Sequence, residues 1–149
     1  MSRSARPLFA LDTALWIHWI EQDDRFLPAV SPWFEALRDE RATAVTSVLA
    51  LLETLTGAFR RGDDLLARRY EEVVGGLSGV SILPVTRSVA RRAAQLRAVH
   101  GLATPDAIHV ATAVEARADE FVTTDRILAR VTEIPVRVLR PSPAKRRRR

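Results

Sequence analysis

Short apolar runs alternate with longer amphipathic segments along the chain, and this pattern predicts an α/β protein with a parallel sheet. Apolar or β-branched runs predict strands at residues 8–11, 42–46, 80–85, 120–123 and 136–139. Apolar positions at helical spacing predict helices at residues 13–21, 47–60, 63–77, 86–100 and 104–117. We also expect a helix that starts near Ser31 and Pro32, and a short one after Asp125.

Glycines and tryptophans refine this map. Gly75, Gly76 and Gly79 form a cluster that predicts a turn, and Gly101 suits the left-handed position after the helix at 86–100. Trp16 and Trp19 stand one helical turn apart. We interpret them as packing in the core or at a dimer interface, with base stacking or partner binding as the alternative.

Four carboxylates interrupt or end apolar segments, where an isolated charge is costly. Asp12 follows the run LFAL, Glu53 lies within VLALLETL, Asp106 opens TPDAIHVATAV, and Asp125 closes FVTTD. Capping would explain Asp12 and Asp125, and a helix dipole would favour Asp106, so taken singly each structural role is as good an explanation as a functional one. Glu53 has no capping role in the middle of its helix. The chain has no cysteine, so a divalent cation is the simplest partner for four acids.

The predicted elements bring these acids to one edge of the sheet. Asp12 and Asp125 come at the carboxyl ends of strands, where open parallel sheets bind ligands. Asp106 lies in the first turn of its helix, and Glu53 lies within side-chain reach of the same edge. Four acids around a cation suit phosphodiester hydrolysis, because the ion activates water and neutralises phosphate. We expect Asp12 and Asp106 to hold the principal ion, and Glu53 and Asp125 to complete its shell, orient the water or hold a second ion.

The segments LDTALW, SVLALLE, TPDAIHVATA and FVTTD, in this order, resemble the PIN-domain nucleases, in particular the VapC-type ribonuclease toxins of toxin–antitoxin pairs. The resemblance covers residues 8–139 and implies a three-layer α/β/α fold with a Mg²⁺ or Mn²⁺ site formed by the four acids. His109 resembles a packing residue of the family rather than a metal ligand. Thr124 stands where members often carry asparagine. The polar residues expected to support the site are Thr13, Ser47, Thr123 and Thr124.

Charge and length set the remaining expectations. Lysine and arginine total 23 against 18 acids in 149 residues, and residues 145–149 account for the whole excess. We expect one nuclease domain at residues 1–140 and a basic, disordered tail at 141–149, which either binds nucleic acid or is merely solvated. No signal peptide or membrane span is apparent, so we expect a cytoplasmic protein. Candidate phosphate contacts are Arg60, Arg61, Arg68, Arg69, Arg87, Arg91 and Arg92, although each is more simply part of a solvated helix face.

The resemblance implies an RNA substrate, a cognate antitoxin and a homodimer. Two other classes of function stay open. The chain could be a PIN-like nuclease of RNA processing or DNA flaps that has no antitoxin, or a non-catalytic binding module that retains the fold. Retention of all four acids disfavours the inactive module, because clustered like charges are hard to explain without an ion.

Overall fold

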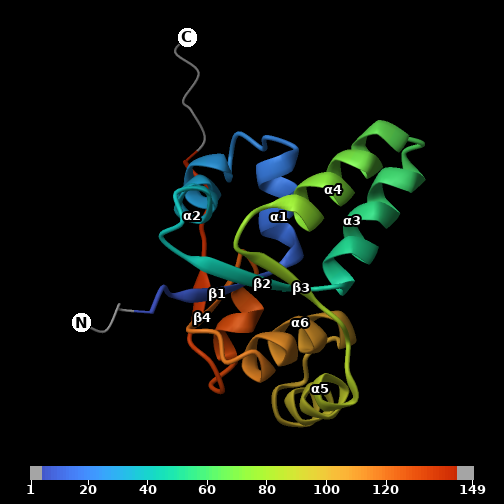
Figure 1. The fold of residues 1–149 in the computed structure, drawn as a ribbon. Coiled ribbons are helices and arrows are strands. Elements are labelled where there is room, and N and C mark those ends of the chain that lie inside the picture. Colours follow the sequence, from blue (N-terminus) through green and yellow to red (C-terminus); the bar gives the residue numbers. More distant parts are fainter. Residues whose placement is uncertain (1–4, 144–149) are drawn as a thin grey trace.

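A computed structural model describes residues 5–143 of the chain, and this part contains five strands and six α-helices (Figure 1). The strands are β1 Leu8–Leu11, β2 Thr43–Ser47, β3 Val80–Leu83, β4 Glu120–Thr123 and β5 Val136–Val138. The helices are α1 Thr13–Ile20, α2 Leu27–Arg38, α3 Leu49–Arg60, α4 Asp64–Gly76, α5 Arg87–His100 and α6 Thr104–Glu115, with a 3₁₀ helix η1 at Arg126–Arg130.

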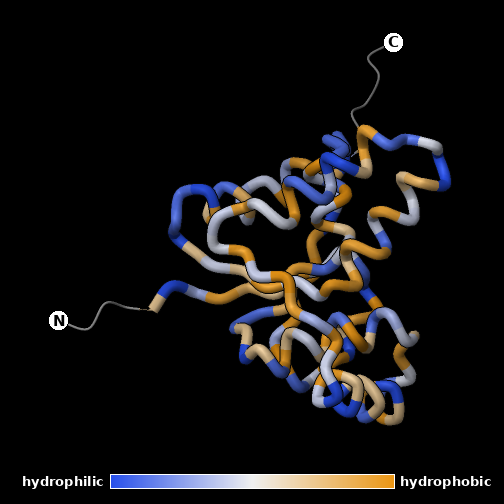
Figure 2. Tube along the Cα trace, turned by 45° about the vertical axis from the view of Figure 1, so that its right-hand side comes forward, coloured by the Kyte–Doolittle hydropathy of each residue, from blue (hydrophilic) through white to orange (hydrophobic). Residues whose placement is uncertain are grey.

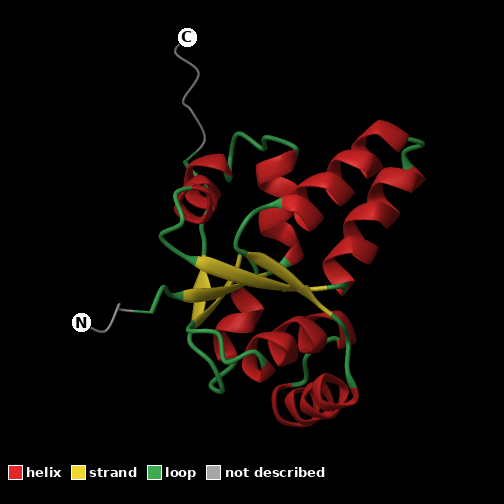
Figure 3. Ribbon diagram, in the orientation of Figure 1, coloured by secondary structure: helices red, strands yellow, loops and turns green. Residues whose placement is uncertain are grey.

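All neighbouring strands pair in parallel, in the order β3-β2-β1-β4-β5. Helices α1 to α4 cover one face of the sheet, and α5 and α6 cover the other (Figures 1 and 3). The predicted three-layer α/β/α architecture is therefore confirmed. Strand β1 lies in the middle, with β2 on one side and β4 on the other, so the order of strands reverses between β1 and β4. Ligands of open α/β sheets bind at such a point, beyond the carboxyl ends of the strands.

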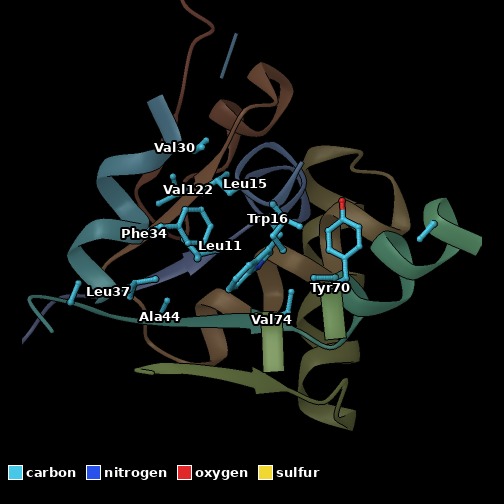
Figure 4. Packing of buried hydrophobic residues seen from close by; sticks show 14 of the residues in the cluster. Leu11, Leu15, Trp16, Val30, Phe34, Leu37, Ala44, Tyr70, Val74 and Val122 are labelled. Carbon is cyan, nitrogen blue, oxygen red and sulfur yellow. The ribbon is translucent and has the colours of Figure 1, made fainter. Parts of the chain in front are cut away.

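The central strands β1 and β4 are mostly apolar on both faces because helices cover both faces of the sheet. Leu11 and Val122 face the core cluster under α1, α2 and α4, whereas Ala10 and Phe121 face the second cluster against α5 and α6. Figure 2 shows hydrophobic strands inside and hydrophilic turns outside. In the first cluster, the wholly buried Trp16 packs edge-on against Phe34 (Figure 4).

The start of α2 differs from the prediction. The helix begins at Leu27, with Pro28 in its first turn, instead of near Ser31. The loop before it is organised by Asp23, whose backbone carbonyl accepts from the N–H groups of Phe26 and Leu27. Pro32 therefore lies inside the helix, where it is exposed and supplies no N–H. Pro28, four residues before Pro32, is the proline in the first turn of α2, so it and not Pro32 marks the start of the helix.

Most other boundaries agree with the prediction within two residues. Gly101 adopts the left-handed conformation after α5, with φ of 66°, as predicted. Residues 144–149, most of the predicted tail, lie outside the described residues. Before them, the Ser142 N–H donates to the Arg25 carbonyl at 2.7 Å. None of the helices in residues 5–143 has the length and apolarity needed to span a membrane.

Candidate metal centre

Asp12 and Asp125 come from the two strands that flank the reversal of strand order. Asp12 directly follows β1 and is the N-cap of α1, and its N–H donates to the Val122 carbonyl of β4 at 3.0 Å. Asp125 follows β4 after one intervening residue and is the N-cap of η1. Both acids therefore do cap helices, as their sequence context allowed. The capping itself places them at the edge where a ligand is expected.

Both oxygens of the Asp12 carboxylate are held by protein donors. The side chain of Asp12 is buried, with 8% exposed. Oδ1 accepts from the Thr13 N–H at 2.8 Å, and Oδ2 accepts from the Thr123 hydroxyl at 2.7 Å. Each oxygen keeps a further lone pair, so these bonds fix the orientation of the carboxylate and leave it able to bind a cation.

Glu53, Thr13 and His109 form a compact polar triangle from three helices. The Thr13 hydroxyl donates to Glu53 Oε1 at 3.0 Å, and His109 Nε2 lies 2.5 Å from the same oxygen and 3.1 Å from Thr13 Oγ1. The hydrogen bond from His109 holds the pKa of Glu53 below its ordinary value, with the Thr13 hydroxyl acting in the same direction. Glu53 is therefore ionised at neutral pH.

The charge of His109 is set by opposing effects. Burial by itself would lower the pKa of His109, but the hydrogen bond to Glu53 and the negative charges of Asp12, Glu53 and Asp106 raise it above its ordinary value. The histidine is thus embedded in the field of three of the four acids.

The pKa of Asp106 is affected by the other three acids, which indicates that the four lie close to one another. Burial raises the pKa of its carboxyl group, and the negative charges of Asp12, Asp125 and Glu53 raise it further. None of the hydrogen bonds within the described part of the chain involves its carboxylate. Asp106 is thus a half-buried acid without a protein donor, surrounded by three others, and a nearby cation would relieve its repulsion.

The supporting polar residues separate into two groups. Thr123 holds Asp12, and its oxygen also accepts from the Asp125 N–H at 3.1 Å, while Thr13 holds Glu53. Ser47 is buried, but its hydroxyl accepts from the Leu49 N–H at 3.1 Å at the start of α3. The half-buried Thr124 forms no side-chain hydrogen bond with the acids in residues 5–143. The structure therefore joins Thr13 and Thr123 to the acids and does not join Ser47 and Thr124.

The four acids lie near one another, but their carboxylates do not converge on a single position for a metal ion. Within residues 5–143, no three side chains of the kinds His, Cys, Asp and Glu are placed to hold one ion between them. The chemistry of the set nevertheless fits Mg²⁺ or Mn²⁺, which prefer carboxylate oxygens. The repulsion at Asp106 and its lack of a donor are the observations of this structure that support the fit.

Two contacts of this region were not foreseen in the sequence. The Thr46 hydroxyl donates to the carbonyl of Leu11 at 3.0 Å and accepts from Trp16 Nε1 at 3.2 Å, which ties the end of β1 to β2 and α1. His109 is buried, as the packing interpretation expects, but it also contacts Glu53. The spacing of three residues from Asp106 places both side chains on one side of α6, and this was the available signal.

The sequence pattern of the PIN domain matches residues 9–134 of the chain. The chain belongs to the PIN-domain family. The match contains all four acids and the elements that carry them. No curated protein matches the chain.

Solved structures with a similar fold include proteins of the VapC type and their complexes. The chain is similar to VapBC2 of Rickettsia felis bound to a promoter DNA fragment, with TM-score 0.71, 15% identity, and 89% of this chain and 98% of that chain covered. DNA-bound VapBC of Salmonella typhimurium gives TM-score 0.66, 21% identity, and 90% and 98% coverage. The sarcin–ricin-loop-cleaving toxin VapC20 of Mycobacterium tuberculosis gives TM-score 0.61, 19% identity, and 76% and 86% coverage. At these identities the likeness concerns the fold.

Proposed function

We propose that this PIN domain is a Mg²⁺- or Mn²⁺-dependent endoribonuclease and the toxin of a type II toxin–antitoxin pair. The observation that carries the nuclease proposal is that Asp12 and Asp125 lie at the adjoining carboxyl ends of β1 and β4, with the half-buried Asp106 within electrostatic reach of both and of Glu53. The mutual repulsion of four neighbouring acids lowers stability unless a cation offsets it, so their proximity favours a cation site. The likeness to toxin structures supports the finer proposal of a toxin.

Asp12 and Asp106 would hold the principal ion, with Glu53 and Asp125 at its margin. When bound, such an ion supplies an activated water, neutralises phosphate oxygens and stabilises the leaving oxygen. Asp12 is oriented for this by two donors. Thr13 and His109 both contact Glu53 Oε1, and none of residues 5–143 donates to its Oε2. An ionised Glu53 accepts a proton from water more readily than a neutral carboxyl group, which suits it to orient the attacking water.

Basic residues must offset the acids when a polyanion binds. Arg61 and Arg92 already pair with Glu21 and Glu115, so these two are weaker candidates for phosphate contacts. Arg87 begins α5 after the carboxyl end of β3, which brings it to the sheet edge that carries the acids. We propose Arg87 as a contact to RNA phosphate.

Cleavage of labelled RNA and DNA by the purified protein with Mn²⁺ tests the enzyme. Asp12→Asn is the matched variant, because asparagine retains an oxygen that can accept the Thr13 N–H and removes the charge. We expect metal-dependent RNA cleavage by the parent and none by D12N, with both chains folded by circular dichroism. Full activity in D12N would contradict the proposed metal site. Preference for DNA would favour the flap-nuclease alternative, and inactivity on both substrates would favour a non-catalytic module.

The antitoxin and the homodimer are tested separately. A toxin should arrest growth when expressed in the cytoplasm, and co-expression of a small protein encoded by a neighbouring reading frame should relieve the arrest and co-purify with the chain. D12N is the control, because it should be harmless while still binding that protein. Light scattering on the purified chain gives its oligomeric state. A nuclease without growth arrest or such a neighbour would support a role in RNA processing.

A further inference from the structure

His109 has the geometry of a residue that fixes another side chain. It lies on α6 with only 3% of its surface exposed. Its Nε2 reaches Glu53 of α3 at 2.5 Å and Thr13 of α1 at 3.1 Å. These are the contacts of its ring with polar groups in the described residues, and they link three helices at the sheet edge where the acids lie.

The direction of these hydrogen bonds follows from the groups present. A carboxylate only accepts, so Nε2 carries a hydrogen toward Glu53 Oε1. The single hydroxyl hydrogen of Thr13 also points to this oxygen, at 3.0 Å. The contact between Nε2 and Thr13 Oγ1 is then a second branch of the same imidazole N–H. Glu53 Oε1 receives two donors, and Oε2 receives none from the described residues.

The other ring nitrogen shows that packing alone does not explain the histidine. Nδ1 of His109 is buried and has no hydrogen-bond partner within residues 5–143. A buried polar atom without a partner lowers stability, whereas leucine would fill a similar space without leaving a polar atom unpaired. Nδ1 is therefore left unpaired among the described residues, while Nε2 donates to Glu53.

A carboxylate on a flexible side chain needs such an anchor. The side chain of Glu53 is 36% exposed, and without a donor on Oε1 it can turn into solvent. Removal of a group that forms a hydrogen bond with a metal-binding side chain typically lowers metal affinity or activity by about 10–100-fold. His109 is well placed for this role because its own position is fixed by burial.

We propose that His109 is a positioning residue that, together with Thr13, holds Glu53 Oε1 and thereby leaves Oε2 to face the cation or the attacking water. This inference rests on the proposed nuclease function. It assigns to His109 neither metal binding nor contact with RNA. It predicts that what matters is a donor at the place of Nε2, and not an imidazole as such.

Two variants of the full chain test the role of the donor. Glutamine places an amide N–H near the position of Nε2, whereas leucine fills the space without a donor. We expect H109L to weaken Mn²⁺ binding, measured by calorimetry, or to lower kcat for RNA cleavage by about 10–100-fold with an unchanged KM for RNA. H109Q should lose less than about tenfold on the same scale. Thr112→Val is the matched control, since Thr112 is buried on the same helix and, within residues 5–143, its hydroxyl forms a hydrogen bond only with the Ile108 carbonyl.

Equal Mn²⁺ affinity and kcat in H109L and the parent would overturn the inference. Equal losses in H109L and H109Q would also overturn it, because shape and not the donor would then be the requirement. If H109L does not fold, H109Q decides: retained Mn²⁺ affinity supports the role of the donor, and a folded H109Q without affinity contradicts it.

A metal-free crystal structure of H109L, or of H109Q if H109L does not fold, separates this inference from the proposed function. We expect Glu53 to leave Thr13 in H109L and to stay in H109Q. A parent protein that binds no Mn²⁺ and cleaves no RNA would end the nuclease proposal, while the crystal structure would still report whether His109 positions Glu53. An unmoved Glu53 in H109L would overturn the inference even if the parent is an active nuclease.

Discussion

Thr123 and Asp12 lie 111 positions apart and are joined by a buried hydrogen bond of 2.7 Å between the Thr123 hydroxyl and Asp12 Oδ2. The oxygen of the same hydroxyl accepts from the Asp125 N–H at 3.1 Å. One side chain at the end of β4 therefore orients the first of the four acids and fixes the backbone of the fourth. Parallel pairing of β1 with β4 makes this possible, because it aligns the carboxyl ends of the two strands.

Replacing Thr123 with valine should weaken the site and also destabilise the fold. The change keeps the shape and leaves a buried carboxylate oxygen and the Asp125 N–H each without a partner, at a cost of about 1–3 kcal/mol. We expect Mn²⁺ affinity, measured by calorimetry, to fall by about 10–100-fold. Thr123→Ser retains the hydroxyl and should stay close to the parent. Equal losses in T123S and T123V would show that the methyl group and not the hydroxyl matters.

Asp106→Asn should stabilise the protein in the absence of metal. The pKa of Asp106 is raised by burial and by Asp12, Asp125 and Glu53, so its ionised form is disfavoured in the folded state. The variant removes this repulsion. We expect a higher Tm than the parent in EDTA, by roughly 2–4 °C for each kcal/mol gained. Mn²⁺ should raise the Tm of the parent and have little effect on D106N.

The advantage of D106N should depend on pH. An acid whose folded pKa is raised costs stability at pH values above that pKa, where it must ionise in the folded protein. The cost diminishes as the pH falls through the raised pKa and is absent below the ordinary value of 3.8. The two melting curves in EDTA should therefore converge between neutral pH and about pH 4. A constant difference over this range would mean that the charge of Asp106 is not its origin.

The order of the elements and the placement of the acids were predictable from the sequence, because both depend on local patterns. Strand β4 was predicted with its observed bounds from the run EFVT and the acid that follows. Gly101 was predicted in its left-handed conformation because a helix ended directly before it. Asp12 and Asp125 were placed at strand ends by position alone, without knowledge of any contact.

The contacts among the acids could not be predicted in the same way. Thr13, Glu53 and His109 lie on three helices, separated by 40 and 56 positions, and their meeting depends on how each helix is rotated on the sheet. Ser47 has the residue type of a site hydroxyl, yet it points to the start of α3. Residue type and spacing therefore indicated the region, whereas strand register and helix rotation decided which side chains touch.

Tyr70→Phe should destabilise the fold and leave the site intact. The hydroxyl of the buried Tyr70 on α4 donates to the carboxylate of Glu21 at the end of α1. Arg61, at the end of α3, donates to the other oxygen of Glu21 through both terminal nitrogens, at 3.1 Å each. Burial and the nearby Glu21 raise the pKa of Tyr70, so the hydroxyl remains a donor at neutral pH. One carboxylate thus connects three helices on one face of the sheet.

A hydrogen bond to a charged group contributes about 1.5–3 kcal/mol, and we expect Y70F to lower the free energy of unfolding by this amount. Arg61→Met removes a half-exposed ion pair and a long, exposed hydrogen bond from Nε to the Gly57 carbonyl at 3.4 Å, so it should cost about 0.2–1 kcal/mol. Urea denaturation measures the free energy of unfolding of both variants. Calorimetry should show parental Mn²⁺ affinity in each, because neither Tyr70 nor Arg61 contacts the four acids of the proposed site. A Y70F chain as stable as the parent would mean that apolar packing of the ring, which phenylalanine keeps, holds α4 against α1. A loss of Mn²⁺ affinity in Y70F would instead show that the placement of α1, and with it Asp12 and Thr13, depends on this bond.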